Sequence, residues 1–406
     1  MTHSTVIVGA GQAASQAAQS LRQWGYSGKI CIVGAEPFAP YQRPPLSKAY
    51  LKGDLSEERL LFKPASWYED QQIELRLSTR ALMIDRSRKT ITLEGGLDIA
   101  YDALILCTGS RPRQLQAPGF NLNGVHDLRS LDDVTRLRPL MTAGRKLVLI
   151  GAGFIGLEAA AAARQMGLDV TVVEMAERVL SRVTSPLVSA FYEKEHLRKG
   201  VKIVKGARLE ELKGRNNTLA EAVLHNGMSI EADLILAGIG ILPNVELAEQ
   251  AGLTIENGIA TDHDARTSDP SIFAAGDCAS RPLVHYDDRR GRLESVHNAI
   301  EQGKLAAAAI LGKPRPPQDV PWFWSDQYDL KLQTAGLLQG YDETIVRGDP
   351  DSRKFSAFYL RSGRILAVDA INSPPDFMAS KRLIAEGTEV PSAKLEDPEF
   401  SLRELL

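Results

Sequence analysis

Two glycine-rich turns, each followed by an acidic residue, are the parts of this chain whose residue types and spacing most clearly predict chemistry. Gly9–Ala14 reads G-x-G-x-x-A, and Gly151–Gly156 reads G-x-G-x-x-G. In this pattern the first glycine permits a tight turn and the second has no Cβ to keep a diphosphate away from the backbone. Glu36 lies 22 residues after the first turn and Glu174 lies 18 after the second. Both spacings are close to the roughly 20 expected for a carboxylate that binds a ribose diol.

The elements around the first turn are those of a nucleotide-binding βαβ unit. The apolar run Val6–Val8 has the pattern of a strand that is buried on both faces. Residues 13–24 are rich in helix formers and stop at Gly25, a typical glycine just beyond a helix. A second strand over Lys29–Val33 leads to Glu36. A purely structural turn is the alternative, but the complete order of elements favours cofactor binding.

The same order of elements recurs 142 residues later. Lys146–Ile150 is a predicted strand, an alanine-rich helix stops at Gly167, and the strand Asp169–Val173 leads to Glu174. Two βαβ units in one chain imply two bound dinucleotides, and the pair is far more specific than either motif alone.

Composition limits the classes of partner and the compartment. With 406 residues the chain is long enough for two or three domains, and 44% hydrophobic and 24% charged residues are ordinary for a soluble protein. A net charge of −3 gives no electrostatic reason for nucleic acid or an anionic membrane as a partner. The apolar runs are too short to span a bilayer. Residues 1–3 lead directly into the first strand, which leaves no room for a signal peptide. We therefore expect a cytoplasmic protein.

The cysteines and histidines offer neither a disulfide framework nor a metal site. The three cysteines, Cys31, Cys107 and Cys278, are too few and too scattered for disulfides, and they fit a reducing compartment. The seven histidines show no metal-ligand spacing.

The segments between and after the two units carry weaker patterns. Three prolines in Phe38–Lys48 predict an extended loop of the kind that often serves a site, with a surface linker as the alternative. Residues 73–99 read as a small β-meander, and Gly238–Asn244 reads as a flexible hinge. Beyond residue 317, four strand patterns and a helix predict a separate α+β unit.

Two short motifs place further residues at the ends of predicted strands. The strand over Tyr101–Thr108 ends at Gly109, where the backbone can approach a ligand closely. Asp277 stands at the carboxyl end of another short strand, which is where open α/β sheets bind ligands. We favour a contact between Asp277 and the sugar chain of a bound dinucleotide over a simple helix cap.

Read together, these motifs resemble a known family over essentially the whole chain. The two fingerprints occur in the right order with four further motifs, which are Pro44–Tyr50, Cys107–Gly109, Phe273–Asp277 and Val320–Asp326. The sequence resembles the FAD-dependent, NADH-using ferredoxin reductases of bacterial oxygenase systems, the family of putidaredoxin reductase and of the biphenyl and carbazole dioxygenase reductases.

This resemblance implies an α/β fold with two interleaved Rossmann-like dinucleotide-binding domains, as in glutathione reductase, and a C-terminal α+β domain. The implied FAD-binding domain comprises residues 1–110 and 238–317. The NAD-binding domain comprises residues 111–237, and the C-terminal interface domain comprises residues 318–406.

The resemblance also implies which residues contact the cofactors FAD and NADH. Those expected at FAD are Ala13, Glu36, Lys48, Ala81, Arg129, Asp277 and Val296. The complete set that we assign to cofactor binding adds Gly9, Gly11, Ala14, Arg43, Thr108, Gly109, Trp322, Gly151, Gly153, Ile155, Gly156, Glu158, Glu174 and Gly240.

Lys48 and Glu158 are the two residues that we assign to catalysis. The resemblance places Lys48 near flavin N5, where a cation favours the electron-rich reduced ring. Glu158 follows the second fingerprint by two residues and could pair with Lys48 and orient the nicotinamide; an ordinary solvated carboxylate is the alternative. Neither needs to act as an acid or base, because hydride transfer depends mainly on positioning.

The absence of a cysteine pair beside the flavin decides how electrons leave it. Disulfide reductases of this fold carry a C-x-x-x-x-C pair after the first βαβ unit, but Pro40–Lys48 contains no cysteine. Electrons therefore pass directly from flavin to an external acceptor, and single-electron release suits an iron–sulfur protein.

Three further features bear on the cofactor and the partner. Glu174 favours NADH because a carboxylate repels the 2′-phosphate of NADPH, although Arg178 and Arg182 lie nearby in sequence. Trp322 and Trp324 are either core aromatics or neighbours of the flavin. Since such ferredoxins are typically acidic, a basic docking patch is expected, with candidates Arg43, Lys48, Lys52, Arg289, Arg290 and Arg292.

The sequence thus predicts an NADH:ferredoxin oxidoreductase that transfers hydride to FAD and single electrons to a transiently bound [2Fe–2S] ferredoxin, which feeds a Rieske-type or P450 oxygenase. The alternatives are reduction of a rubredoxin or another small acceptor, and a redox-sensing flavoprotein resembling apoptosis-inducing factor. We expect no metal, no nucleic acid, no membrane, and a monomer or weak homodimer.

Overall fold

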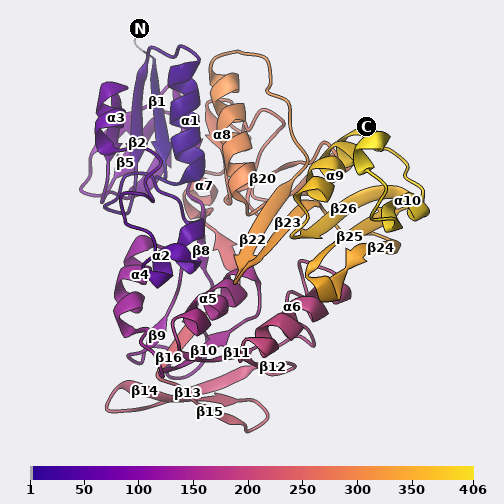
Figure 1. Ribbon diagram of the computed structural model, residues 1–406. Coiled ribbons are helices and arrows are strands. Elements are labelled where there is room, and N and C mark those ends of the chain that lie inside the picture. The colour runs from indigo at the N-terminus through magenta and orange to yellow at the C-terminus, as the bar shows by residue number, and fades with distance from the viewer. Residues whose placement is uncertain (1–2) are drawn as a thin grey trace. The chain divides into compact units, whose positions relative to one another are not determined.

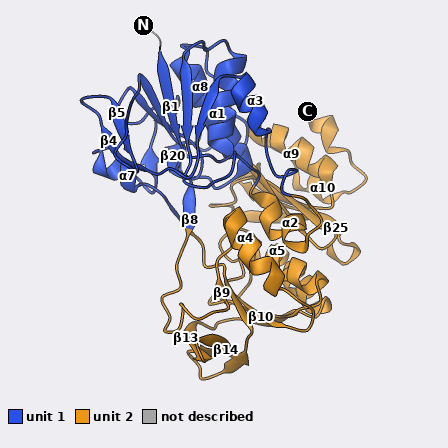
Figure 2. Ribbon diagram, turned by 90° about the vertical axis from the view of Figure 1, so that its left-hand side faces the viewer, with its two compact units in different colours: residues 1–42, 57–111, 242–321 blue, residues 43–56, 112–241, 322–406 orange. Residues whose placement is uncertain are grey.

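The computed structural model describes residues 3–406. Met1 and Thr2, part of the segment for which we expected no signal peptide, lie outside the described residues. The chain divides into two compact units, one made of residues 1–42, 57–111 and 242–321 and the other of residues 43–56, 112–241 and 322–406 (Figure 2). The division into three domains stays a prediction.

A five-stranded parallel sheet with the order β19-β7-β1-β2-β3 lies at the centre of the first unit. Its strands are β1 (Ser4–Val8), β2 (Lys29–Val33), β3 (Ile73–Arg76), β7 (Ala103–Leu106) and β19 (Ile272–Ala274). Because neighbouring side chains of a strand point to opposite faces, Ile7 and Val8 belong to different cores. Helices α1 (Gln12–Gln23) and α8 (Val296–Ile310) pack against each other on the Ile7 face (Figure 1).

The opposite face of this sheet is covered by a three-stranded antiparallel meander and by α7 (Glu246–Gln250). The meander comprises β4 (Ala81–Asp85), β5 (Thr90–Leu93) and β6 (Asp98–Ala100). Our prediction of a meander over 73–99 is therefore wrong at its start, since Ile73–Arg76 pairs in parallel with β2. The short apolar stretch has the same local pattern in either sheet, and only tertiary pairing decides between them.

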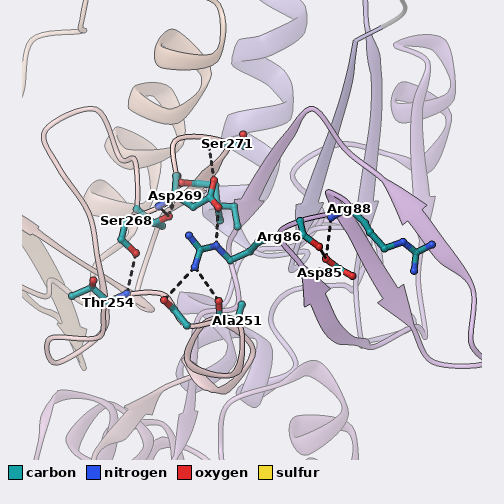
Figure 3. A network of polar contacts seen from close by, with 12 residues as sticks. Asp85, Arg86, Arg88, Ala251, Thr254, Ser268, Asp269 and Ser271 are labelled. Atoms are coloured by element: carbon teal, nitrogen blue, oxygen red, sulfur yellow. Dashed lines mark hydrogen bonds and ion pairs between the residues drawn. The ribbon is translucent and has the colours of Figure 1, made fainter.

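A polar network joins the meander to the neighbouring loops of the same unit (Figure 3). In the turn between β4 and β5, Arg86 Nε donates to Asp269 Oδ2 at 2.8 Å, and its Nη1 donates to the carbonyl of Ala251 at 3.3 Å. Asp269 Oδ1 also accepts from the backbone N–H of Ser271 at 2.9 Å. One guanidinium thus fixes both the end of α7 and the turn that precedes β19.

The remaining elements of the first unit are short. They are α3 (Ala65–Asp70), β18 (Ile259–Ala260), β20 (Ala279–Pro282) and β21 (Arg290–Gly291). Two of the unit boundaries fall within strands, one within β8 (Ser110–Pro112) and one within β17 (Ile241–Pro243).

The second unit repeats the parallel arrangement in a sheet with the order β12-β11-β10-β16-β9. Its strands are β9 (Val125–His126), β10 (Lys146–Ile150), β11 (Asp169–Val173), β12 (Lys202–Val204) and β16 (Leu234–Ala237). Helix α5 (Phe154–Gln165) crosses between β10 and β11, and the antiparallel strands β13 (Leu209–Arg215), β14 (Thr218–Leu224) and β15 (Ser229–Glu231) share a core with this sheet. Helices α4 (Leu131–Leu137), η2 (Arg138–Leu140) and α6 (Pro186–Arg198) were not predicted.

The proline-rich segment is helical where we expected an extended loop. Pro44–Ser47 forms the 3₁₀ turn η1, and Ala49–Lys52 forms the short helix α2. Proline restricts φ to about −65°, and that value suits the first turn of a helix as well as an extended chain. The two prolines stand at the first positions of η1, so the extended prediction is wrong there.

The C-terminal part of the second unit is a five-stranded antiparallel sheet with the order β22-β23-β26-β25-β24. Its strands are β22 (Trp322–Gln327), β23 (Leu330–Gly336), β24 (Glu343–Asp349), β25 (Lys354–Arg361) and β26 (Arg364–Ile371). The helices η3 (Pro350–Ser352), α9 (Pro374–Glu386), α10 (Ser392–Glu396) and η4 (Leu402–Leu405) complete it. The predicted α+β character of this region is confirmed. Among residues 3–406, no helix combines the length and the apolar composition that crossing a membrane requires.

Candidate functional site: two dinucleotide-binding turns and a partly buried ion pair

The first glycine-rich turn lies between β1 and α1 and has the geometry of a diphosphate cradle. Gly9 has a φ of +111°, and a Cβ there would lie 2.0 Å from the carbonyl oxygen of Cys107. Gly11, in contrast, has an extended backbone, and a Cβ there would meet nothing within 4 Å. At the first position the fold leaves no room for a side chain, whereas the second position faces open space that a ligand can occupy.

Helix α1 begins at this turn with backbone N–H groups that no side-chain cap satisfies, because its N-cap is Gly11. Such groups bind a diphosphate, and the helix dipole adds to the attraction. Ala13 and Ala14 are buried, and a Cβ on Gly276 would lie 3.2 Å from that of Ala13. The residues present therefore fit an adenine dinucleotide, and they bring the Gly276–Asp277 motif next to the turn.

Several other predicted residues of the first unit have defined partners. Glu36 accepts a hydrogen bond at 2.6 Å from the hydroxyl of Tyr41, and Asp277 accepts one at 2.7 Å from Ser110. Neither donor was predicted, because single Tyr and Ser residues carry no local signal in the sequence. Thr108 exchanges hydrogen bonds with Asn244, which fixes the chain beside Gly109. Ala81 begins β4 and Val296 begins α8.

A pair of substitutions separates the two functions of the first turn. We expect Gly11→Val to leave the apoprotein within about 0.5 kcal/mol of its original stability and to weaken FAD binding about tenfold or more, because the side chain enters the ligand space. Gly9→Val should instead destabilise the fold itself by about 3 kcal/mol or more, through the clash and the positive φ. The measurements are FAD content by absorbance and denaturant unfolding of the apoprotein. Equal loss of stability in both variants would contradict this assignment.

The second turn repeats this geometry between β10 and α5. Gly151 has a φ of +103°, and a Cβ there would lie 2.4 Å from the carbonyl oxygen of Gly238. A Cβ on Gly156 would lie 2.4 Å from the carbonyl oxygen of Gly151, whereas one on Gly153 would meet nothing within 4 Å. Gly153 caps α5 without a side chain, so the same fit to a dinucleotide diphosphate applies.

The carboxylate of Glu174 is held beside this second turn by two backbone groups. Oε2 accepts from the N–H of Ala152 at 2.7 Å, and Oε1 accepts from the N–H of Ala176 at 2.8 Å. Arg178 is directed elsewhere, since its guanidinium donates to the carbonyls of Ser181 and Thr184 at 2.7 and 3.0 Å. The acid therefore lies at the turn, while one of the two nearby arginines is occupied by the backbone.

Lys48 and Glu158 form an ion pair within the second unit, in which the carboxylate is buried and the lysine is partly exposed. Lys48 Nζ lies 2.5 Å from Glu158 Oε2, and the Glu158 side chain is only 4% exposed. Two hydroxyls also donate to this carboxylate, Ser47 Oγ to Oε2 at 2.7 Å and Ser325 Oγ to Oε1 at 2.6 Å. The pair that the sequence suggested is formed, but the two serines were not predicted. The solvated alternative for Glu158 is excluded by its burial.

The other predicted residues of the second unit differ in what they contact. Arg43 Nη1 donates to the carbonyl of Arg129 at 2.9 Å, which brings these two together. Ile155 is 43% exposed at the start of α5, and Gly240 accepts a backbone hydrogen bond from Arg113. Trp322 is half-buried against Trp324, with ring centroids 5.7 Å apart.

Most of the candidate basic docking residues are already paired within their own unit. Four of the six lie within ion-pair distance of a carboxylate, namely Lys48 with Glu158, Lys52 with Asp54, Arg290 with Glu256 and Arg292 with Glu294. Paired cations attract an acidic partner less strongly than free ones, so the expected basic patch is weaker than the sequence suggested.

Comparison with known proteins agrees with this architecture. The family model for pyridine nucleotide-disulphide oxidoreductases matches residues 3–303, and a reductase C-terminal model matches residues 322–406. Rhodocoxin reductase of Rhodococcus erythropolis is 43% identical over 98% of this chain and 93% of its own. Putidaredoxin reductase CamA of Pseudomonas putida is 42% identical over 99% and 96%. A rubredoxin-NAD(+) reductase of Pseudomonas putida is 40% identical over 91% and 96%.

A solved structure is also similar along its full length. The covalent putidaredoxin reductase–putidaredoxin complex contains a chain that matches with a TM-score of 0.97 and 41% identity, over 99% of this chain and 98% of the other.

Two βαβ units with open diphosphate cradles define an oxidoreductase that uses two dinucleotides, FAD and NAD(P)H. The chain belongs to the pyridine nucleotide-disulphide oxidoreductase family and, within it, to the ferredoxin reductases that supply oxygenase systems with electrons. The predicted fold class and enzyme class are confirmed.

Proposed function

We propose that this chain is an NADH-dependent reductase of a [2Fe–2S] ferredoxin and that it uses the Lys48–Glu158 pair to position the reacting groups. The preference for NADH is supported by the Glu174 carboxylate, which lies at the second turn on two backbone N–H groups. A carboxylate there accepts hydrogen bonds from both ribose hydroxyls and repels a 2′-phosphate. These two hydrogen bonds fix the orientation of the carboxylate at the turn.

The ion pair between Lys48 and the buried Glu158 carboxylate is the observation on which the proposed mechanism depends. FAD supplies the ability to accept a hydride and to release single electrons. The chain supplies a lysine whose charge is held in a fixed place by a buried carboxylate at 2.5 Å. A preorganised charge of this kind costs no reorganisation during reaction and favours an electron-rich group beside it. Glu158, on the helix that follows the second turn, is suited to orient the nicotinamide.

The route by which electrons leave is supported by the cysteines. All three are buried as free thiols, and none lies in the segment that contains Lys48. Burial raises the pKa of Cys107 and of Cys278, which suppresses the thiolate that thiol exchange requires. We therefore assign no thiol step to the reaction.

We also propose cytoplasmic location, a monomer or weak homodimer, no nucleic-acid partner, and no metal bound by this chain.

The test is reduction of cytochrome c by NADH in the presence and absence of a [2Fe–2S] ferredoxin. We expect turnover to rise about 100-fold or more when ferredoxin is added, because a specific carrier replaces slow direct transfer. Substitution of a rubredoxin for the ferredoxin examines the second candidate, which the similarity to a rubredoxin-NAD(+) reductase favours. Equal turnover without any carrier would contradict the proposal. Faster turnover with rubredoxin than with ferredoxin would identify rubredoxin as the acceptor instead.

A further inference from the structure

Glu158 is one end of a chain of hydrogen bonds that runs through the second unit. Ser325 Oγ donates to Glu158 Oε1 at 2.6 Å, and Gln327 Nε2 donates to Ser325 Oγ at 3.2 Å. Gln327 Oε1 lies 2.8 Å from His196 Nε2, and His196 Nδ1 lies 3.1 Å from the hydroxyl of Tyr328. The chain links α5 to β22 and then to α6, which are distant in sequence.

The interior of this chain of hydrogen bonds is closed to water. Ser325 and His196 have no exposed surface, Gln327 is 1% exposed and Glu158 is 5% exposed. Only Tyr328, at the far end, is partly exposed. Buried polar groups must find their partners within the protein, so each of these side chains depends on its neighbours for its hydrogen bonds. Burial also lowers the pKa of His196 to about 4, which leaves its ring with a single N–H proton at neutral pH.

The direction of every link follows from the carboxylate. Because a carboxylate only accepts hydrogen bonds, Ser325 must donate to Glu158 and is left to accept from the amide N–H of Gln327. The amide oxygen of Gln327 then faces His196, which must carry its proton on Nε2. Nδ1 of His196 is left to accept from the hydroxyl of Tyr328. All four donors thus point toward Glu158.

We propose that Ser325, Gln327 and His196 are positioning residues that hold the Glu158 carboxylate in the rotamer in which it pairs with Lys48. The chain engages Oε1 and leaves Oε2 for Lys48 and Ser47. Aligned hydrogen bonds strengthen one another in a low-dielectric interior. Without the donor at Oε1, the carboxylate is held at Oε2 alone, by Ser47 and Lys48, so the position of the partner of Lys48 is less well fixed. The kinetic consequence rests on the role of Glu158 in the proposed function.

The direction of the hydrogen bonds in this series is testable without any reaction. We expect the ¹⁵N spectrum of the oxidised holoprotein at pH 7 to show His196 protonated on Nε2 and unprotonated on Nδ1. Among the seven histidines, the resonances of His196 are those that disappear in a His196→Gln variant. Protonation on Nδ1, or on both nitrogens, would overturn the proposal. This measurement uses no NADH, so its failure is distinct from failure of the proposed function.

Kinetics then separate positioning from simple structural support. We expect Ser325→Ala to slow reduction of bound FAD by NADH roughly tenfold, as loss of a hydrogen bond to a charged group predicts, with FAD content unchanged. Ser356→Ala is the matched control, because Ser356 is a buried serine of the same sheet that donates to another buried carboxylate, Asp376, at 2.7 Å. That control should change the rate less than about twofold.

A double-mutant cycle completes the test. In a Glu158→Gln background, Ser325→Ala should have less than about a twofold effect, because the carboxylate it positions is gone. A tenfold effect that persists in this background, or an equal effect of Ser356→Ala, would overturn the proposal. If Glu158→Gln alone leaves the rate unchanged, the proposed function of Glu158 fails, while the tautomer of His196 still decides whether the chain is polarised.

Discussion

Replacing Lys48 with Met is expected to slow reduction of the bound FAD by NADH about 100-fold, the size of effect seen when one preorganised electrostatic group is removed. The substitution keeps much of the side-chain volume but removes the charge that lies 2.5 Å from Glu158. It leaves a carboxylate that is 4% exposed without its counter-charge, and an uncompensated buried charge is strongly unfavourable. The midpoint potential of the flavin should fall as well, since a cation stabilises the reduced ring.

The matched control for this prediction is Lys52→Met. Lys52 lies four residues further along the same segment and pairs with Asp54, whose side chain is 59% exposed. Exposed pairs contribute little, so the control should reduce at nearly the original rate. The measurements are stopped-flow reduction under anaerobic conditions and potentiometric titration. A Lys48→Met protein with an unchanged potential and rate would remove Lys48 from the flavin site.

Replacing Glu174 with Arg is expected to reverse the preference between the two nicotinamide cofactors. The carboxylate now lies on the N–H groups of Ala152 and Ala176, where it suits a ribose diol. Arginine at this position would instead pair with a 2′-phosphate. We expect kcat/KM with NADH to fall about 100-fold and that with NADPH to rise about tenfold, since charged hydrogen bonds of this kind are each worth about 1.5–3 kcal/mol.

Glu177→Arg provides the control for charge alone. Glu177 is exposed and stands three residues beyond Glu174, so it makes the same change in net charge outside the turn. Steady-state kinetics with both cofactors should show little change in its preference. If the unmodified protein already used NADPH as well as NADH, the interpretation of Glu174 would be wrong.

The parts of the fold that follow from local pattern could be predicted from the sequence. The glycine spacing, the apolar strands and the acids at fixed distances all act within about 30 residues, and they define both βαβ units. Pairing between distant strands has no such local signal, which is why Ile73–Arg76 was assigned to the meander. The helical turn at Pro44–Ser47 was missed because proline suits both structures.

The residues of the candidate site also fall into those that could be predicted from the sequence and those that could not. Lys48 and Glu158 could be proposed from the motifs that contain them, and the structure brings the two together. Ser47, Ser325 and Gln327 could not be found, because isolated polar residues in a strand or a turn look like any others. Their importance comes from burial beside a carboxylate, a property that only the folded chain has.

The most direct test of the central claim, that electrons pass from NADH through FAD to a one-electron carrier with no protein dithiol, is an anaerobic titration of the holoprotein. One equivalent of NADH per bound FAD should bleach the flavin absorbance, and two equivalents of oxidised [2Fe–2S] ferredoxin should restore it. The thiol count after denaturation should stay at the three cysteines of the chain throughout. A thiol count that changes with reduction, or a flavin that NADH does not bleach, would contradict the account.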